Sequence, residues 1–476
     1  MYAVDVDFCP IRFVFDDYIW KRDAPYADYN GKLIPSRVPT SALVAGPIAG
    51  QPYLNSTIAN IHPRAVSRRY FEQICPEPYI LDPRDTLSAI GTDASAFQIM
   101  SVFGKKLQSI NDRCVEIQKD TTQLFDYWYT FPFLFLSSFE RYLRRVLGSA
   151  RLHDIMPTLI QSPIMRDFAW SPLINYAFQK NQHHFTTSRK PSLLSMLLPF
   201  LTSRASSISY EMRTQMTPTS PVSKTESLPV LALHLRRGDF IEHCDNLYNW
   251  NSTYTGFNTQ PSLPDRFFME NTTLRDSMSA DEMKEAYKQK CLINVDEVRK
   301  RVIRAVTEWR NERLRSIRKR KGSRFSALGN EDEGVKEMLR KVYIMTNGDH
   351  EFLNQIKLAL SSDAQRSTLR TDNEFKAEDA YARSTTGSSS SSNQYNYDFA
   401  WSWDEISTSR DMDLSWETKY VAQAMDMYVG QRAEVFVGNG FSSLTANVVL
   451  LRTVAGVEPW RTRFWWLPCF ILEIGL

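Results

Sequence analysis

The sequence lacks any stretch of about 18 consecutive apolar residues, so no membrane-spanning helix is expected. Lys and Arg number 57 against 54 acidic residues, a net charge of +3, and this balance calls for neither nucleic acid nor an anionic membrane as a partner. The six cysteines lie far apart, and no pair has the spacing of a zinc site or a redox motif; they are Cys9, Cys75, Cys114, Cys244, Cys291 and Cys469. Structural zinc and thioredoxin-like chemistry are therefore not expected.

The first residues also lack a secretory signal. Met1–Pro10 has no basic start, no apolar core and no cleavage site. Three N-glycosylation sequons, at Asn55, Asn251 and Asn271, nevertheless favour a secretory lumen. We therefore expect either a cytosolic chain or one whose true start lies upstream. In an oxidising lumen one or two disulfides are expected, and their pairing stays open.

The length of 476 residues favours two domains. The segment 203–228 is rich in Ser and Thr and is typical of a linker. We assign residues 1–202 to an N-terminal domain and residues 229–476 to a C-terminal domain, in which strand and helix patterns alternate as in a doubly wound α/β sheet. Residues 361–392 are polar and end in a serine run, so they are predicted to form a disordered insertion.

The main chemical clue follows an apolar run in the C-terminal domain. Val230–Leu233 predicts a strand that is buried on both faces, as in a parallel sheet. His234, Arg236, Arg237 and Asp239 come directly after it. Ligands of open α/β sheets bind beyond the carboxyl ends of the strands, and two guanidinium groups there suit phosphate oxygens. The alternative is a solvated turn in which Arg237 or Asp239 forms an ordinary surface ion pair.

A second candidate anion site lies near the end of the chain. Glu434–Val437 predicts a short strand, Gly438–Gly440 a turn, and Ser442 or Ser443 the start of a helix. Such a helix start presents free backbone amides and the positive end of the helix dipole to an anion. The segment is neither a P-loop nor the dinucleotide fingerprint, and the alternative is an ordinary capped helix. Together, the two segments could grip one nucleoside diphosphate.

Both segments resemble motifs of the GDP-fucose protein O-fucosyltransferases. His234–Phe240 is similar to the family's His-x-Arg-Arg-x-Asp-Phe motif, and Phe436–Thr445, followed by Arg452, is similar to its C-terminal motif. Four shorter pieces resemble fungal members: Phe15–Tyr18, Ile34–Arg37, Gly46–Pro47 and Arg463–Trp465. The resemblance implies an α/β fold of the GT-B type, in which two Rossmann-like domains face each other across the cleft that holds the active site.

The resemblance also implies the chemistry. Fucose would pass from GDP-fucose to a hydroxyl of a protein or glycan acceptor, with inversion, without a metal and without a cofactor. His234 and Arg236 would contact the donor, with Arg236 on its phosphates as the catalytic cation, and Asp426 would recognise the guanine. Three residues would hold the diphosphate and the nucleotide end: Ser442, Ser443 and Leu444.

The sequence departs from the family pattern at its start. The family's first strand and Gly-rich loop, which carries the catalytic base in part of the family, should precede Phe13, and no residue here matches that base. Family members work in the lumen of the ER or Golgi, so the resemblance implies a secretory protein and a truncated start. Two alternatives stay open: a GDP-sugar-binding pseudoenzyme, and a GT-B transferase that uses another nucleotide sugar.

Overall fold

A computed structural model describes the chain in segments and covers the C-terminal half most fully. The described residues are 2–3, 12–14, 18–19, 25–29, 32–35, 37–38, 42–46, 65–66, 68–82, 85–86, 94–117, 153–186, 221, 226–238, 240–249, 252–265, 267, 278–321, 334–369, 401–415 and 418–465. The three sequon asparagines lie outside them, as does nearly all of the predicted linker.

The C-terminal part is built on one five-stranded sheet in which every pairing is parallel. Its strands are β12 (Leu228–Leu235), β13 (Lys341–Thr346), β14 (Glu405–Thr408), β15 (Ala433–Gly438) and β16 (Thr462–Phe464). Their spatial order is β14-β13-β12-β15-β16. If the strands are numbered along the chain, this is the order 3-2-1-4-5 of a Rossmann-type sheet. The prediction of a parallel α/β sheet in this part of the chain is confirmed.

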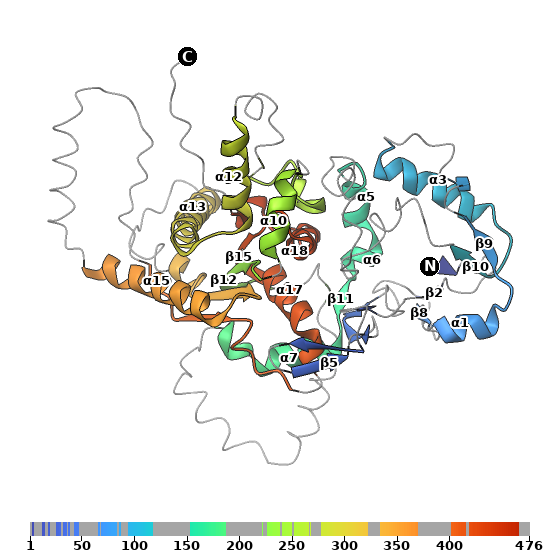
Figure 1. The fold of residues 1–476 in the computed structure, drawn as a ribbon, viewed down its shortest axis with the longest axis horizontal. Coiled ribbons are helices and arrows are strands. Elements are labelled where there is room, and N and C mark those ends of the chain that lie inside the picture. Colours follow the sequence, from blue (N-terminus) through green and yellow to red (C-terminus); the bar gives the residue numbers. More distant parts are fainter. Residues whose placement is uncertain are drawn as a thin grey trace, which may run out of the picture.

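The two faces of the sheet are apolar and are covered by different helices (Figure 1). In β12, Leu231 and Leu233 belong to one core cluster, while Val230 and Ala232 belong to the other, as the alternation of side chains along a strand requires. The first cluster includes α13 (Val295–Lys321) and α15 (His350–Leu369). The second includes α7 (Pro172–Lys180), α17 (Ala422–Arg432) and α18 (Ser443–Val454). Burial on both faces explains why the strands read as apolar runs.

A third cluster lies beside the carboxyl end of the sheet. It joins α10 (Phe240–Asn249), which begins just after β12, to α12 (Ala280–Cys291). The 3₁₀ turn η7 (Gly256–Thr259) packs alongside α18. A disulfide between Cys244 and Cys291 links α10 to α12. This cluster therefore packs beside the carboxyl ends of the strands, where ligands of such folds bind.

The described residues of the N-terminal part form short elements. The strands are β1 (Tyr2–Ala3), β2 (Arg12–Val14), β3 (Tyr18–Ile19), β4 (Tyr26–Tyr29), β5 (Lys32–Pro35), β6 (Arg37–Val38), β7 (Val44–Ala45), β8 (Ala65–Val66), β9 (Tyr79–Leu81), β10 (Val115–Ile117) and β11 (Ala169–Trp170). The helices are α1 (Arg68–Ile74), α3 (Ala96–Gln108), α5 (Met156–Gln161) and α6 (Pro163–Arg166). Short 3₁₀ turns lie here and in the C-terminal part: η4 (Gln182–His184), η9 (Lys419–Val421) and η10 (Pro459–Arg461).

One small unit of the N-terminal part has β-α-β connectivity. Strands β9 and β10 pair in parallel, and α3 lies between them in the sequence. Leu81, Phe103 and Val115 form part of its core, and a disulfide joins Cys75 to Cys114. The predicted boundary at 203–228 stays a prediction.

One prediction fails at a helix end. Residues 361–392 were expected to lack structure, yet α15 continues to Leu369. Once the buried first turns, which include Leu353 and Ile356, have nucleated the helix, each further residue adds a backbone hydrogen bond at little cost. A polar composition alone therefore misplaces the helix end. Residues 370–392 lie outside the described part of the chain.

Candidate functional site

The candidate site lies at the carboxyl edge of the sheet, between β12 and β15. These strands pair in parallel, with Leu233 opposite Val437. The turn Arg236–Gly238 that follows β12 therefore lies beside the turn Asn439–Ser442 that follows β15. This is the point where the strand order reverses direction, and open α/β sheets bind their ligands there. The fold thus brings together the two segments that the sequence singled out separately.

Arg237 is anchored by its surroundings. Its backbone N–H donates to Asn347 Oδ1 at 2.9 Å, and its Nη1 donates to the carbonyl of Ile293 at 3.2 Å. Its guanidinium also lies 3.9 Å from the centre of the Phe352 ring, a cation–π contact. The Arg237 side chain therefore has a structural role: it connects the turn after β12 to the loop between α12 and α13 and to α15.

Arg236 occupies the same turn, half-buried, with its guanidinium 5.6 Å from the centre of the Phe240 ring. The turn itself requires glycine at position 238, because the φ of Gly238 is +60° and a Cβ atom there would lie 3.2 Å from Asn347 Nδ2. This left-handed residue lets the chain leave β12 and enter α10 directly. Asp239 lies outside the described residues.

The turn between β15 and α18 is tightly packed. A Cβ atom on Gly438 would lie 2.4 Å from Thr445 Cγ2, and one on Gly440 would lie 2.4 Å from the Tyr254 ring. Asn439 is 1% exposed, and its Oδ1 accepts from the Phe441 N–H at 2.9 Å. Both glycines are therefore needed for close approach, and the turn has little freedom to change shape.

The start of α18 has the features of an anion site. Ser442 takes the N-cap position, where its φ of −98° and ψ of 130° are extended, and Ser443 is exposed as the first helical residue. The N–H groups of the first turn have no acceptor within a helix, and the dipole there is positive. The side chain of Leu444 is 5% exposed and packs in the core. Of Leu444, only the backbone can face a ligand at this edge.

His234 supports the site from within the sheet. It is 3% exposed, and its Nδ1 lies 2.8 Å from Thr445 Oγ1, in the first turn of α18. Burial, aided by the charge of Arg236, lowers the pKa of His234 to about 3, so the ring is neutral at physiological pH. A neutral ring cannot act as a cation toward phosphate. Its predicted contact with the donor stays a prediction, and the observed contact holds the β12 end against α18.

Asp426 lies on α17, next to β13 and the end of β14, and is 8% exposed. Its carboxylate accepts hydrogen bonds from the Tyr343 hydroxyl at 2.5 Å and the Ser409 hydroxyl at 2.9 Å. Burial raises the pKa of Asp426 to about 7, although the two hydroxyl donors oppose the shift. Both oxygens of the buried carboxyl group thus already accept hydrogen bonds, from the Tyr343 and Ser409 hydroxyls.

The shifted pKa of Asp426 predicts a pH-dependent stability. Between pH 3.8, the ordinary pKa of the group, and about pH 7, the Asp426 carboxyl group is protonated in the folded chain and ionised in the unfolded chain. The free energy of unfolding should therefore fall as the pH rises through this window and be independent of Asp426 at higher pH. Urea unfolding of the wild type and of Asp426→Asn, measured at several pH values, checks this. The wild-type curve should fall more steeply, and parallel curves would contradict the prediction.

The comparisons with known proteins concern the whole chain. No family model matches the sequence, and no curated protein matches it. The structure is similar to solved structures of POFUT1. The apo form has a TM-score of 0.38 and 12% identity, over 96% of this chain and 89% of that one. The complex with GDP in crystal form III has a TM-score of 0.35 and 12% identity, over 92% of this chain and 88% of that one. The complex with GDP-fucose in crystal form I has a TM-score of 0.32 and 13% identity, over 92% of this chain and 86% of that one.

Several residues that shape the site were not found from the sequence. Asn258, 2% exposed, donates from Nδ2 to the carbonyl of Gly440 at 2.8 Å and to that of Ser442 at 3.2 Å. Asn347 and Asn439 hold the two turns in the same way, by hydrogen bonds to the backbone. Asparagine side chains of this kind give no periodic signal, because their partners are backbone groups far away in the sequence.

Two arginines of the C-terminal motifs have structural partners. Arg452, 1% exposed, donates to the carbonyls of Gly430 at 3.1 Å, Gln431 at 3.3 Å and Ala433 at 2.6 Å. Arg463 forms a buried ion pair with Asp265. These side chains hold α17 and β16 to their neighbours.

Metal ligands and membrane helices were also sought among the described residues. Within them, no group of three or more His, Cys, Asp and Glu side chains is placed to hold a metal ion. No helix in the described part of the chain is long and apolar enough to cross a membrane.

Proposed function

We propose that this protein is a glycosyltransferase that binds GDP-fucose at the edge between β12 and β15 and transfers fucose to a hydroxyl of a protein or glycan. One observation carries the proposal. The strand order 3-2-1-4-5 puts the arginine turn after β12 next to the helix start after β15, at the switch point of the sheet. A diphosphate would be held by a guanidinium from one side and by backbone amides from the other. The motif resemblance supports GDP-fucose as the donor.

The chemistry follows from this arrangement. The acceptor oxygen attacks the anomeric carbon from the face opposite the diphosphate, the sugar–phosphate bond breaks, and GDP leaves with the bonding electrons. Arg236 and the amides of Ser443 and Leu444 stabilise the charge that builds on the departing phosphate, which is the role a metal ion has in other transferases. The proton of the acceptor passes to a base or to a water molecule, and we assign no residue to that base.

The rest of the proposal concerns architecture and location. We propose a GT-B arrangement in which the N-terminal part, including the β9–α3–β10 unit, supplies the acceptor side. Two disulfides, Cys75–Cys114 and Cys244–Cys291, support a secretory compartment, because disulfides persist in oxidising environments. Asp426 is proposed as the residue that recognises the guanine.

The first test is GDP binding with and without a chelator. Isothermal titration of the purified chain with GDP should give saturable binding, and the affinity should be unchanged when EDTA is present, because Arg236 and the helix start replace the metal. Loss of binding in EDTA, restored by Mg²⁺ or Mn²⁺, would overturn the metal-independent mechanism. No binding of GDP in either buffer would overturn the donor site itself.

The same protein preparation separates the two alternatives. A thermal-shift panel of GDP-fucose, GDP-mannose and UDP-sugars shows which donor binds, since only a ligand of the folded state raises the unfolding temperature. A transfer assay with the best donor then distinguishes an enzyme from a pseudoenzyme. Binding of GDP-fucose with no hydrolysis and no transfer would favour the pseudoenzyme.

A further inference from the structure

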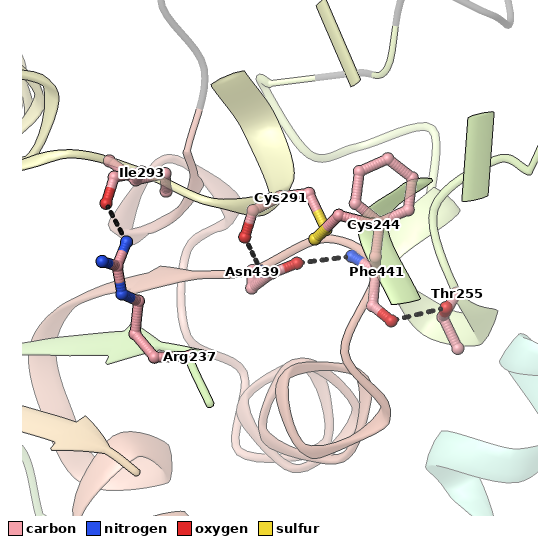
Figure 2. The surroundings of a disulfide bond; sticks show 7 residues. All are labelled: Arg237, Cys244, Thr255, Cys291, Ile293, Asn439 and Phe441. Carbon is pink, nitrogen blue, oxygen red and sulfur yellow. Dashed lines mark hydrogen bonds between the residues drawn. A yellow bond between two sulfur atoms is a disulfide. The ribbon is translucent and has the colours of Figure 1, made fainter. Parts of the chain in front are cut away.

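The disulfide Cys244–Cys291 lies beside Asn439 and Phe441 of the turn after β15, and Ile293, two residues after Cys291, contacts Arg237 (Figure 2). Both cysteines are 1% exposed. Cys244 is on α10, the helix that begins where the arginine turn ends, and Cys291 is the last residue of α12. The bridge therefore fixes the end of α12 relative to the segment that follows β12.

The segment Cys291–Ile293 contacts both turns of the site, one through the carbonyl of Cys291 and the other through the carbonyl of Ile293. The Asn439 side chain donates from Nδ2 to the carbonyl of Cys291 at 3.1 Å, and Arg237 donates from Nη1 to the carbonyl of Ile293 (Figure 2). Asn439 belongs to the turn after β15, whereas Arg237 belongs to the turn after β12. One stretch of backbone thus ties together the two turns between which the diphosphate would lie.

The turn after β15 is also held from the opposite side. Thr255 donates from its backbone to the carbonyl of Gly440 at 2.9 Å and from Oγ1 to that of Phe441 at 3.2 Å. Asn439 Oδ1 accepts from the Phe441 N–H, so its two side-chain polar atoms link the turn to itself and to Cys291. On the side that faces α12, the turn is held by the Asn439 hydrogen bond, and that contact depends on where the carbonyl of Cys291 lies.

We propose that the Cys244–Cys291 disulfide is a positioning element, which sets the spacing of the arginine turn and the α18 helix start for the donor diphosphate. This rests on the proposed function and deepens it. Without the bridge, α12 can move relative to α10, and the carbonyls of Cys291 and Ile293 move with it. The anion receptors on the two turns then lose their fixed separation, and a diphosphate must order them when it binds.

The protein offers a matched control in its other disulfide. Cys75–Cys114 joins the residue after α1 to the residue before β10, in the N-terminal part of the chain. We therefore compare the double variants Cys244→Ser/Cys291→Ser and Cys75→Ser/Cys114→Ser with the wild type. Each loses one bridge of similar loop length, with sequence separations of 47 and 39, so the entropic effect on the unfolded chain is similar.

The readouts are GDP affinity and amide hydrogen exchange, both measured well below the unfolding temperature of each variant. Loss of Cys244–Cys291 should weaken GDP binding about tenfold, the equivalent of one charge-assisted hydrogen bond, and speed exchange at Ser443–Thr445. Loss of Cys75–Cys114 should change neither. Equal GDP affinity and equal exchange in the two variants would overturn the positioning role.

Two further outcomes are separated by design. If the wild type does not bind GDP, the proposed function fails, and the exchange rates at Ser443–Thr445 still decide whether the bridge orders the turn. If Cys244→Ser/Cys291→Ser does not fold, the folded Cys75→Ser/Cys114→Ser variant is reduced instead. Dithiothreitol supplies two electrons, closes to its own cyclic disulfide and leaves Cys244 and Cys291 as thiols. Unchanged GDP affinity and exchange after that reduction would likewise overturn the proposal.

Discussion

Arg236→Lys should weaken GDP binding by about 1.5 to 3 kcal/mol, roughly tenfold to 150-fold, although the formal charge is kept. A guanidinium can hold two phosphate oxygens at once through its planar fork, whereas an ammonium group offers a point charge. The contact with the Phe240 ring also favours the planar group in this position. Titration of GDP into the variant and the wild type measures the difference.

Transfer should fall further than binding in the same variant. The negative charge on the diphosphate grows as the sugar leaves, so a contact on that group is stronger in the transition state than in the bound donor. Removal of one such contact typically raises the activation free energy by about 2.7 to 4 kcal/mol. The comparison of kcat with the Kd for GDP in Arg236→Lys therefore tests the catalytic role of Arg236 separately from binding.

Arg237→Lys is the control for this prediction. The guanidinium of Arg237 already donates to the carbonyl of Ile293 and lies over Phe352. A lysine at this position can still donate to that carbonyl, so GDP affinity should change much less than in Arg236→Lys. Equal losses in the two variants, or a larger loss in Arg237→Lys, would show that Arg237 is the residue that faces the phosphates.

The strands of the site could be predicted from the sequence because their signals are local. Val230–Leu233 and Glu434–Val437 lie inside β12 and β15, and the helix start at Ser442 and Ser443 is where it was expected. Burial on both faces makes each strand a continuous apolar run, and a glycine turn before a serine is a local signal for a helix start.

The contacts that hold the turns could not be predicted, because they join distant parts of the chain. Asn439 and Cys291 are 148 residues apart, and the pairing of Cys244 with Cys291 was one of many possible pairings of six cysteines. Leu444 shows a different limit. The motif assigned it to the ligand, whereas its side chain packs in the core and only its backbone faces the edge.

Arg452→Met should destabilise the fold by about 3 to 5 kcal/mol, because several buried carbonyls lose a donor, at about 1 to 3 kcal/mol for each group left unsatisfied. The guanidinium of Arg452 donates to the carbonyls of Gly430, Gln431 and Ala433 at the end of α17. It also donates to the carbonyl of Arg461 at 2.9 Å. The last carbonyls of a helix have no partner within it. Methionine fills much of the same volume and leaves these acceptors buried without a donor.

Arg432→Met is the matched control for Arg452→Met. Arg432 lies at the same end of α17 but is only half-buried, and it donates to the Tyr428 hydroxyl at 2.6 Å and the carbonyl of Glu226 at 3.1 Å. Its loss should lower the free energy of unfolding by about 1 kcal/mol or less, since solvent can replace an exposed contact. Urea unfolding measures both variants. If Arg452→Met instead kept its stability and lost GDP affinity, Arg452 would be a donor contact and not the cap of α17.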